Sequence, residues 1–576
     1  MNNLEIKIYK PNRWLLRFIP AALSALVFLA ACGSDDATPP TMVPVAAVTD
    51  TPVPTSKVGG GVVMSLNHPQ SLNPILNPVS TTIFNSPFFF NGLTKPGDGM
   101  EPLPDLAEKW EIVDKGLSYN FYLRKDVRWH DGEQFTAADV KFSWEATCHP
   151  DNARGAQICG FFSAVKGAID FKAGNATSIS GIKTPDPFTV QVEMNQIFAP
   201  FLTVSAAQMI LPEHVWGKVA VKEMGAHPAS RGTGTIGTGP FKVNSWTANE
   251  KIELEANTDY YEGRPNLDSL ILRQTSPAPP AIAARLSQLK VGEVHAMGLY
   301  AAVPADHVAE IEASSRNQIR SLTGLANQYV EFNLRNPLFK DVRMRKAISY
   351  ATNRNELKEG LWLGKADFVN GPIHPIHSWA INPNTPLFDN DVDKAVALFG
   401  ELGWTKGSDG ILQKDGKKLS IPFQGCCGLA SYGPVLQQQW KRAGIQVELE
   451  AMDFGSFWGP VYLAKKHVIA GLNLPYGLYT DPEYPMGGYF TPGRNRSGWD
   501  SARGKELIGL ATSTSDQKER AKYYFELQTV MANDVPNLWL GIPQEHWGFA
   551  KDLVIPEKKT GYLTVRTAKD WYWKNR

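Results

Sequence analysis

The most informative stretch of this chain is YNFYLRKDVRWHDGEQFTAADVKFSW, residues Tyr119–Trp144. Its first five residues alternate apolar and polar side chains, which is typical of a half-buried β-strand. The segment Thr189–Met194 alternates in the same way. Further along, Phe241–Val243 and Ile252–Leu254 flank the turn-like Thr247–Glu250, and this arrangement predicts a β-hairpin.

Three helices are predicted from the residues that would cap them. Asp341, Asp391 and Asp516 each precede apolar residues at helical spacing. Gly403 stands where a C-terminal glycine belongs, and Glu519 completes a capping-box-like pair with Asp516. Strands and helices both recur through the chain without a fixed repeat of about 20 to 50 residues. This pattern favours the α/β class over a solenoid or propeller.

Length and charge narrow the choice of partner. A chain of 576 residues exceeds what one hydrophobic core usually supports, so two or three packed domains are expected. The 41 prolines and 49 glycines predict many turns. The formal net charge is only +1, which argues against nucleic acid as a partner.

The amino terminus has the layout of an export signal. Arg13 and Arg17 precede an apolar run from Pro20 to Ala31, and Cys32 follows. The alternative is a transmembrane helix. However, Phe18–Ala31 would form a helix only about 21 Å long, which is short of the roughly 30 Å hydrocarbon core of a bilayer.

The sequence Leu29-Ala30-Ala31-Cys32 resembles the lipobox of bacterial lipoproteins, which implies lipidation of Cys32 and cleavage just before it. Residues 1–31 would then be a signal peptide, and residues 32–57, which are rich in Pro and Thr, a tether. We expect folding to begin near Val58, with a first strand at Val62–Leu66. The folded part would be extracytoplasmic and anchored to the membrane by lipid.

Four cysteines remain for the folded part. Cys148 and Cys159 could close a short disulfide loop, worth roughly 3 kcal/mol in the loop-entropy model. Cys426 and Cys427 are adjacent, so a bridge between them would be strained, and two reduced thiols are the alternative. Neither pair has the spacing of a metal site.

Two motifs could indicate a nucleotide site and a metal site, but the residues around them argue against both. Gly232–Gly237 matches G-x-G-x-x-G, but Pro240 and a predicted hairpin follow where a nucleotide-binding motif needs a helix. His374 and His377 flank a proline and lack further ligands nearby, so a turn is favoured over a metal site. The chain has no G-x-S-x-G, H-E-x-x-H or P-loop motif. We therefore predict a protein that is not an enzyme, with no catalytic residues, metal or cofactor.

The stretch Tyr119–Trp144 closely resembles the signature of the family 5 bacterial extracellular solute-binding proteins, which includes oligopeptide-, dipeptide- and nickel-binding proteins. Pro104–Trp110 resembles the lead-in to that signature. Gly237–Leu270 and Tyr329–Arg354 are similar to two later blocks of the family, and the blocks occur in family order. The resemblance covers the chain from about residue 58 to the C-terminus.

The resemblance implies a bilobed α/β fold of the large, three-domain, periplasmic-binding-protein-like type, with the ligand cleft between the lobes. The expected divisions are a discontinuous domain I (58–92, 213–336 and 534–576), domain II (93–212) and domain III (337–533). Hinge closure would enclose the ligand. Trp129–Gly132 would then be structural, with Trp129 packed and Asp131-Gly132 forming a turn.

By position in the family, ligand contacts would come from the end of the first strand and from loops of domain III. The residues implied are Asn67, His68, Tyr432, Trp458, Tyr476, Tyr479 and Asp481. The three positions Trp458, Tyr476 and Tyr479 lie in a stretch rich in aromatic residues, Phe454–Tyr489, which suits binding of peptides or sugars.

Peptide-binding members resemble W-x-x-D followed shortly by D-P, and the earlier aspartate pairs with the peptide α-amino group. Here Leu474–Pro482 reads LPYGLYTDP, so the tryptophan and the earlier aspartate are missing, and Asp481 is the aspartate before proline. Oligosaccharides, modified peptides and other solutes therefore stay open beside peptides.

The sequence thus predicts the substrate-binding protein of an ABC importer, of peptide type by family. Its partners would be a small-molecule or peptide ligand, the permease subunits and the membrane through the lipid anchor, and the protein itself would be a monomer. An exported peptide or glycan hydrolase is the alternative from another class. A sensor that hands its ligand to a signalling receptor is a third possibility.

Overall fold

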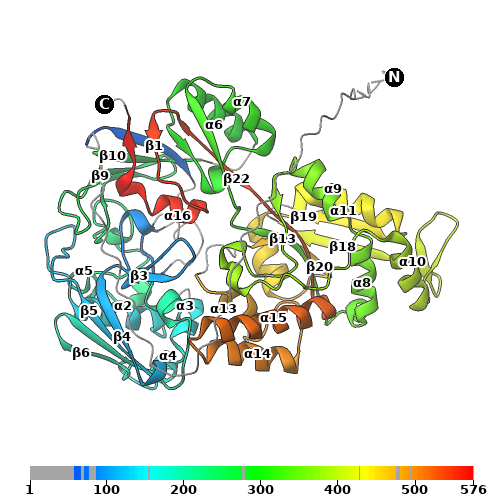
Figure 1. The fold of residues 1–576 in the computed structure, drawn as a ribbon, viewed down its shortest axis with the longest axis horizontal. Coiled ribbons are helices and arrows are strands. Elements are labelled where there is room, and N and C mark those ends of the chain that lie inside the picture. The colour runs from blue at the N-terminus through cyan, green and yellow to red at the C-terminus, as the bar shows by residue number, and fades with distance from the viewer. Residues whose placement is uncertain are drawn as a thin grey trace, which may run out of the picture. The chain divides into compact units, whose positions relative to one another are not determined.

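The computed structural model describes residues 58–66, 71–76, 86–152, 156–275, 279–426, 429–474, 480–491 and 494–574. The chain divides into Met1–Pro54 and Thr55–Arg576, and all described residues belong to the second part, whose architecture follows (Figure 1). Among the described helices, none combines the length and the apolarity needed to cross a membrane.

The first lobe contains a seven-stranded sheet with strand order β12-β22-β11-β1-β10-β9-β8. Its strands are β1 (Gly61–Leu66), β8 (Phe241–Thr247), β9 (Lys251–Ala256), β10 (Ser269–Gln274), β11 (Ala296–Met297), β12 (Asn317–Leu322) and β22 (Glu545–Ala550). Strand β1 runs parallel to both β10 and β11. The predicted first strand and the predicted hairpin, which is formed by β8 and β9, are confirmed.

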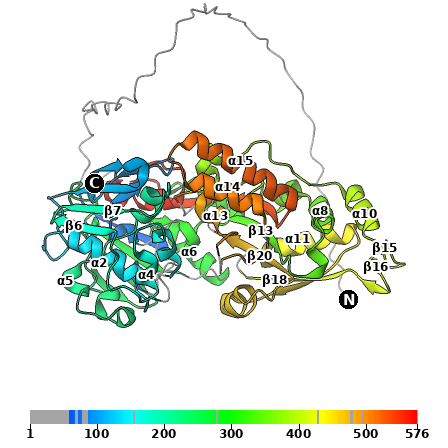
Figure 2. The ribbon, with the colours of Figure 1, turned by 90° about the horizontal axis from the view of Figure 1, so that it is seen from below.

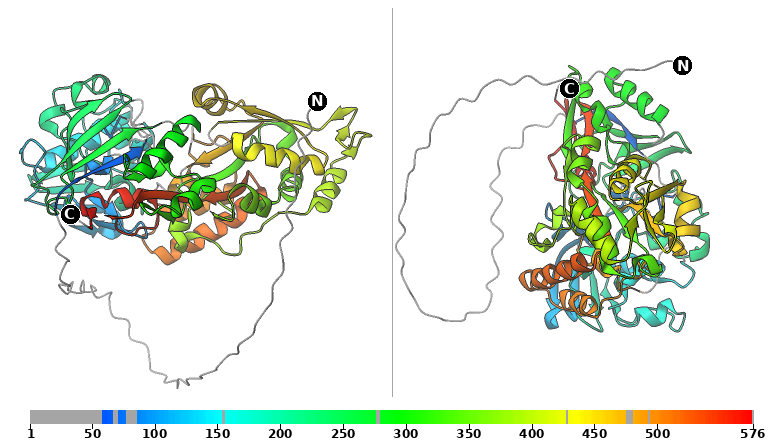
Figure 3. Two further views of the ribbon diagram at one scale, coloured as in Figure 1. Left: turned by 90° about the horizontal axis from the view of Figure 1, so that it is seen from above. Right: turned by 90° about the vertical axis from the view of Figure 1, so that its right-hand side faces the viewer.

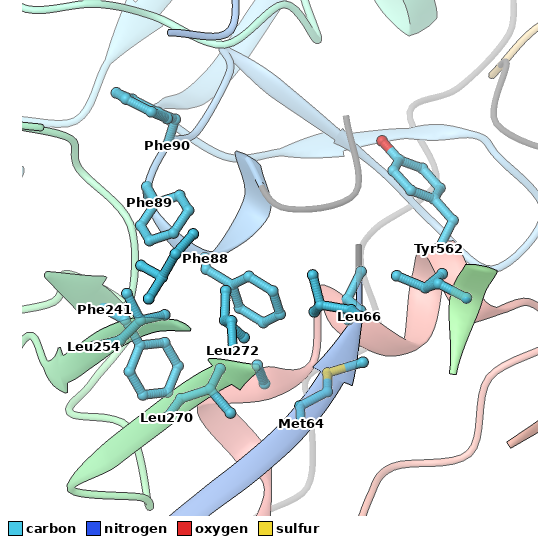
Figure 4. Packing of buried hydrophobic residues seen from close by; sticks show 14 of the residues in the cluster. Met64, Leu66, Phe88, Phe89, Phe90, Phe241, Leu254, Leu270, Leu272 and Tyr562 are labelled. Atoms are coloured by element: carbon cyan, nitrogen blue, oxygen red, sulfur yellow. The ribbon is translucent and has the colours of Figure 1, made fainter. Parts of the chain in front are cut away.

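One face of this sheet is buried by aromatic and aliphatic side chains. Met64 and Leu66 of β1 lie beside Leu270 and Leu272 of β10, and Phe88 packs over them (Figure 4). Full burial of each such side chain contributes about 1.5–3 kcal/mol. Helices α6 (Pro279–Val291), α7 (Val308–Glu312) and α16 (Gly561–Val565) complete this part of the lobe.

A four-stranded antiparallel sheet, with order β4-β5-β7-β6, forms the rest of the first lobe. Its elements are β4 (Ala107–Val113), β5 (Ser118–Leu123), β6 (Ile182–Asp186), β7 (Thr189–Glu193) and helices α2 (Ala137–Cys148), α3 (Ala156–Cys159), α4 (Ala168–Lys172) and α5 (Glu213–Trp216). The strands predicted at Tyr119–Leu123 and Thr189–Met194 are β5 and β7. Trp129 is buried and Gly132 adopts φ +96° in the predicted turn.

The second lobe contains a six-stranded sheet with order β14-β21-β13-β20-β18-β19. Its strands are β13 (Asn327–Phe332), β14 (Ala366–Asp367), β18 (Ser420–Gly425), β19 (Gln446–Ala451), β20 (Ile469–Leu474) and β21 (Asn537–Pro543). Val330 and Phe332 of β13 face one core, whereas Tyr329 faces another. Side chains alternate between the two faces along a strand, so β13 contributes to a core on each face, and helices cover both faces of this sheet.

The helices of the second lobe fall into two layers. One layer contains α8 (Val342–Tyr350), α10 (Val392–Glu401) and α11 (Leu429–Arg442), and the other contains α13 (Glu483–Gly487), α14 (Ala502–Thr512) and α15 (Gln517–Asp534). Helices α14 and α15 pack side by side (Figure 2). Figure 3 shows these orange helices and the yellow α11 on opposite sides of the sheet.

The three predicted helix starts are confirmed. The side chains of Asp341, Asp391 and Asp516 accept hydrogen bonds from backbone N–H groups in the first turns of α8, α10 and α15. Each such cap contributes about 1 kcal/mol. Gly403 follows α10 with φ +83°, as its position predicted.

Smaller elements join these sheets. They are the hairpin β2 (Thr94–Pro96) and β3 (Pro102–Pro104), the ribbon β15 (Thr405–Lys406), β16 (Leu412–Lys414) and β17 (Lys417–Lys418), the pair β23 (Leu553–Val554) and β24 (Tyr572–Trp573), and helices α9 (Arg354–Glu356) and α12 (Phe454–Phe457).

The chain passes between the two sheets at β12–β13 and again at β21–β22 (Figure 1). The two crossing segments touch, since a Cβ on Gly324 would lie 1.8 Å from the carbonyl oxygen of Pro543. Sheet membership therefore assigns β13 and β21 to the second lobe, whereas the boundaries that the family resemblance implies lie at 336/337 and 533/534. The difference arises because both crossings occur in extended chain, with no turn signal at the change of lobe.

Two cysteine pairs were open from the sequence. Cys148, the last residue of α2, forms a disulfide with Cys159, the last residue of α3. Cys426 is also disulfide-bonded, and it is buried. Cys427 lies outside the described residues.

Candidate ligand-binding site

One edge of the seven-stranded sheet gathers the ends of several strands. Strands β1, β10 and β11 run parallel, so their carboxyl ends lie at one edge of the sheet. Strand β22 runs antiparallel to β11, so β22 begins at that same edge. In open α/β sheets, ligands bind outside the carboxyl ends of the strands. Asn67 and His68 come directly after β1 in the sequence, and both lie outside the described residues.

Glu545, the first residue of β22, carries a buried carboxylate at the same edge. Among the described residues no charged group pairs with either carboxylate oxygen, and the indole N–H of Trp547 lies beside them. Both groups pack close to Gly561 of α16. Burial raises the pKa of Glu545 to about 8, against a small lowering by Trp547. A protonated Glu545 can donate a hydrogen bond, whereas an ionised Glu545 would pair with a cation. The sequence carries no spacing signal for this residue.

Asp481 is held within the second lobe. Its carboxylate lies 2.7 Å from Nη2 of Arg520 and accepts a hydrogen bond from the backbone N–H of Glu483. The hydroxyl of Tyr524 completes the group, 3.1 Å from Arg520. Only 2% of Asp481 is exposed. Because the side chain is buried and its Oδ1 already pairs with Arg520 and Glu483, Asp481 supports the start of α13.

The ion pair of Asp481 also shifts the properties of its partners. Burial alone would lower the pKa of Arg520, but Asp481 and Tyr524 offset that effect and raise the pKa above its ordinary value. Burial raises the pKa of Tyr524 well above its usual range. Arg520 therefore stays charged and Tyr524 neutral at any physiological pH.

Tyr432 is a core residue, contrary to its expected place in the cleft. It is 1% exposed, and its hydroxyl donates to the backbone carbonyls of Leu472, at 3.3 Å, and Tyr329, at 3.5 Å. Burial raises the pKa of this hydroxyl above its ordinary value. The sequence did carry the signal, because Leu429, Tyr432, Leu436 and Trp440 recur at helical spacing on α11.

Trp458 retains partial exposure. Its ring stacks on Phe454, with centroids 5.4 Å apart, and packs against Tyr462 at 5.1 Å. Phe454 is 54% exposed, so this ladder of rings begins at the surface. Tyr476 and Tyr479 lie outside the described residues. Of the second-lobe residues predicted from the sequence, Trp458 is thus the described one with a ring that a ligand can reach.

Tyr462 connects the ring ladder to a buried acid. Its hydroxyl donates to Oε2 of Glu331 at 3.3 Å, and Nε2 of His467 lies 3.4 Å from Oε1 of Glu331. Glu331 and His467 are almost fully buried. Sequence reasoning missed both, because Glu331 lies within β13 and its partners are more than 130 residues away.

The motifs that were set aside as structural have structural partners. The imidazole Nε2 of His374 lies 2.6 Å from the carbonyl oxygen of Gly324, so His374 holds the first crossing segment. Burial lowers the pKa of His374 to about 4. The N–H of Gly237 donates to His130 in a loop that leads into β8. Across the described part of the chain, no group of three or more His, Cys, Asp or Glu residues could hold a metal ion.

A pocket of about 320 Å³ lies in the first lobe, between the β2–β3 hairpin and α16. Ion pairs cross its wall, including Lys95 with Glu262 and Lys558 with Asp98. Arg566 lines it and lies 4.0 Å from the buried Asp105. No described residue that we predicted from the sequence as a ligand contact lines this pocket.

Comparison with known proteins gives consistent results. The model of the bacterial extracellular solute-binding proteins, family 5 Middle, matches residues 101–497. The oligopeptide-binding protein AppA of Bacillus subtilis is 28% identical over 526 residues, covering 88% of this chain and 89% of AppA. The dipeptide-binding protein of Escherichia coli is 27% identical over 501 residues, covering 83% and 88%.

The same similarity appears in three dimensions. The solved structure of Bacillus subtilis AppA in complex with a nonapeptide superposes with a TM-score of 0.75 at 25% sequence identity. The superposition covers 90% of this chain and 99% of AppA. Both lobes are therefore shared with that protein.

Proposed function

Because the chain belongs to family 5 of the bacterial extracellular solute-binding proteins, we propose that it is the substrate-binding protein of an ABC importer and that its ligand is a peptide. The observation that carries the proposal is the match in sequence and fold to AppA over nearly the whole length of both chains. The members of this family bind solutes and are not enzymes.

The site supports binding without covalent chemistry. Two lobes joined by two extended crossings can close on a ligand, and the closed state would be favoured by the ligand's differential affinity. On the second lobe the ligand would meet Trp458, Tyr476 and Tyr479, and at the edge of the seven-stranded sheet it would meet Asn67 and His68. Tyr432 and Asp481 would support these surfaces from behind.

The ligand's amino group needs a different partner from the one that the family motif supplies. The earlier aspartate is missing, and Asp481 is paired with Arg520. Among the described residues, Glu545 is a carboxylate without a charged partner at the sheet edge where ligands would bind. A peptide with a blocked or modified amino group would need no such partner, and an oligosaccharide is the second candidate cargo.

We also propose the division into domains that the family implies, with the boundaries moved to the crossings. Domain III would run from Asn327 to Pro543, and domains I and II would make up the first lobe. Support comes from the separate hydrophobic cores around the seven-stranded, four-stranded and six-stranded sheets.

The last part of the proposal concerns the predicted signal peptide and lipobox at the amino terminus. Cleavage after Ala31 would leave lipidated Cys32 as the first residue, and residues 32–57 would tether a monomeric binding body near its permease. An anchor of this kind raises the local concentration of the binder at the transporter. Metabolic labelling with radioactive palmitate tests it: wild-type protein should be labelled and the Cys32→Ala variant should not.

Native mass spectrometry of freshly purified protein tests the cargo. We expect retained peptides, and we expect a pool of synthetic nonapeptides to raise the melting temperature while a pool of oligosaccharides does not. Trp458→Ala should weaken the peptide effect. If only oligosaccharides stabilised the protein, the proposed ligand would be a sugar and not a peptide. Turnover of either pool would overturn the assignment as a binding protein.

A further inference from the structure

The two lobes contact each other at a site built from aromatic residues. Phe161 of the first lobe and Tyr484 of α13 in the second lobe have ring centroids 5.5 Å apart. Val204 joins them, and all three are less than 9% exposed. We call Phe161, Val204 and Tyr484 the closure contact.

Two hydrogen bonds between the lobes lie beside the closure contact. The backbone N–H of Ala199 donates to the carbonyl of Thr512 at 2.8 Å. The hydroxyl of Thr480 donates to the carbonyl of Thr203, one residue before Val204. The segment 199–204 of the first lobe is therefore bound to the second lobe at three points.

On the first lobe, Phe161 is held by a disulfide and by a hydrogen bond. It follows Cys159 by two residues, and Cys159 is linked to Cys148 at the end of α2. The hydroxyl of Ser205 donates to the carbonyl of Phe161 at 2.9 Å. Because α2 packs in the core of the four-stranded sheet, the disulfide ties the 3-10 helix Gly160–Phe162, which carries Phe161, to that core.

On the second lobe, Tyr484 is held by charged groups. The guanidinium of Arg494 lies over its ring, 4.3 Å from the centroid. The Asp481–Arg520 ion pair fixes the start of α13, through the hydrogen bond from Glu483 to Asp481. Thr480, which bonds the first lobe beside the closure contact, follows Tyr479 directly in the chain, so the contacts between the lobes adjoin the segment that carries two of the proposed ligand contacts.

We propose that Phe161 and Tyr484 are positioning residues that set ligand affinity through the closed state without touching the ligand, and that the Cys148–Cys159 disulfide holds Phe161 in place for this role. The proposal rests on the proposed function. Contacts made only when the lobes meet favour the closed state, and the apparent affinity scales with the fraction of protein that is competent to close. Capture should therefore depend on the oxidation state of this disulfide.

Small-angle X-ray scattering of the ligand-free protein tests the contact itself. Phe161→Ala and Tyr484→Ala should each raise the radius of gyration, and the double variant should rise no further than the larger single variant. Phe171→Ala is the control, since Phe171 is equally buried in the same lobe and lies outside the closure contact. If both variants scatter like the wild type and like Phe171→Ala, the contact does not bias closure.

Affinity for the best-binding member of the nonapeptide pool tests the consequence. An aromatic pair of this kind corresponds to up to about a tenfold change in an equilibrium constant. We expect each variant to raise the dissociation constant by about that factor, mainly because the peptide dissociates faster. A lower melting temperature with unchanged affinity would show ordinary packing and overturn the proposal.

The double variant Cys148→Ser, Cys159→Ser tests the disulfide. Serine variants are needed because reductant would also reach Cys426, which is disulfide-bonded too. We expect weaker binding in the wild-type background and no added effect in the Phe161→Ala background. Additive losses would show that the disulfide acts elsewhere. If the wild type binds no peptide, the proposed function fails, while the scattering result still decides the closure contact.

Discussion

The surroundings of Asp481 in the second lobe and those of Glu545 in the first lobe show two ways to bury a carboxylate. Asp481 has a charged guanidinium at 2.7 Å and a backbone N–H at 2.9 Å. Glu545 has no charged partner among the described residues, and only the indole N–H of Trp547 acts to lower its pKa. An ion without partners in an apolar site takes up a proton instead, which is why burial raises the pKa of Glu545 to about 8. The first carboxylate is thus held in an ion pair, whereas the charge of the second depends on pH.

Removing the charged partner of Asp481 should have the largest effect on stability, because it leaves Asp481, like Glu545, buried without a charged partner. Arg520→Met leaves a buried charge without compensation, so we expect a loss of about 3–5 kcal/mol in the free energy of unfolding, measured by urea denaturation. Arg503→Met is the matched control. Arg503 pairs with Glu526 at the same 2.7 Å, but both are more than 40% exposed, and its loss should stay below about 1 kcal/mol. Equal losses would contradict the comparison.

Changing Glu545 should produce an effect that depends on pH. The folded protein keeps a proton on Glu545 up to about pH 8, whereas the unfolded chain releases it above about pH 4.5. Wild-type stability therefore falls as pH rises through this window. The advantage of Glu545→Gln over wild type should grow by roughly 1 kcal/mol per pH unit between pH 5 and pH 8.

The control for that measurement is Glu526→Gln, since Arg503 lowers the pKa of Glu526 and that residue is exposed. Its stability difference from wild type should not grow over the same range. A difference for Glu545→Gln that is constant with pH would mean that the Glu545 carboxylate is ionised throughout this range.

The smallest effect should come from the hydroxyl beside the ion pair. Tyr524→Phe removes the oxygen that Arg520 reaches at 3.1 Å while the carboxylate stays paired, so we expect a loss of about 1 kcal/mol. Tyr122→Phe, whose hydroxyl bonds Glu111 at an exposed position, should be near neutral. A loss for Tyr524→Phe as large as that for Arg520→Met would show that the hydroxyl, not the guanidinium, compensates Asp481.

The same two regions show what could be predicted from the sequence. The caps of α8, α10 and α15 were found because each rests on residues two or three positions apart. Asp481 and Arg520 are 39 positions apart, and no local pattern joins them. Glu545 is buried by Gly561 and Trp547 only once β22 lies against α16. Tyr432 lies in the core, as its helical spacing with Leu436 and Trp440 indicates, although its position in the family implies a place in the cleft.

The order of strands in the first lobe has a consequence for how the molecule is made. Strand β22 lies between β11 and β12 in the seven-stranded sheet, although it is some 220 residues later in the chain than β12. The strands of the six-stranded sheet of the second lobe all lie between Asn327 and Pro543, so all are available before Glu545 is synthesised. A growing chain can thus finish its second lobe first. The first lobe begins earlier but keeps an open sheet edge until its last strand arrives, so it is the later of the two to complete its fold.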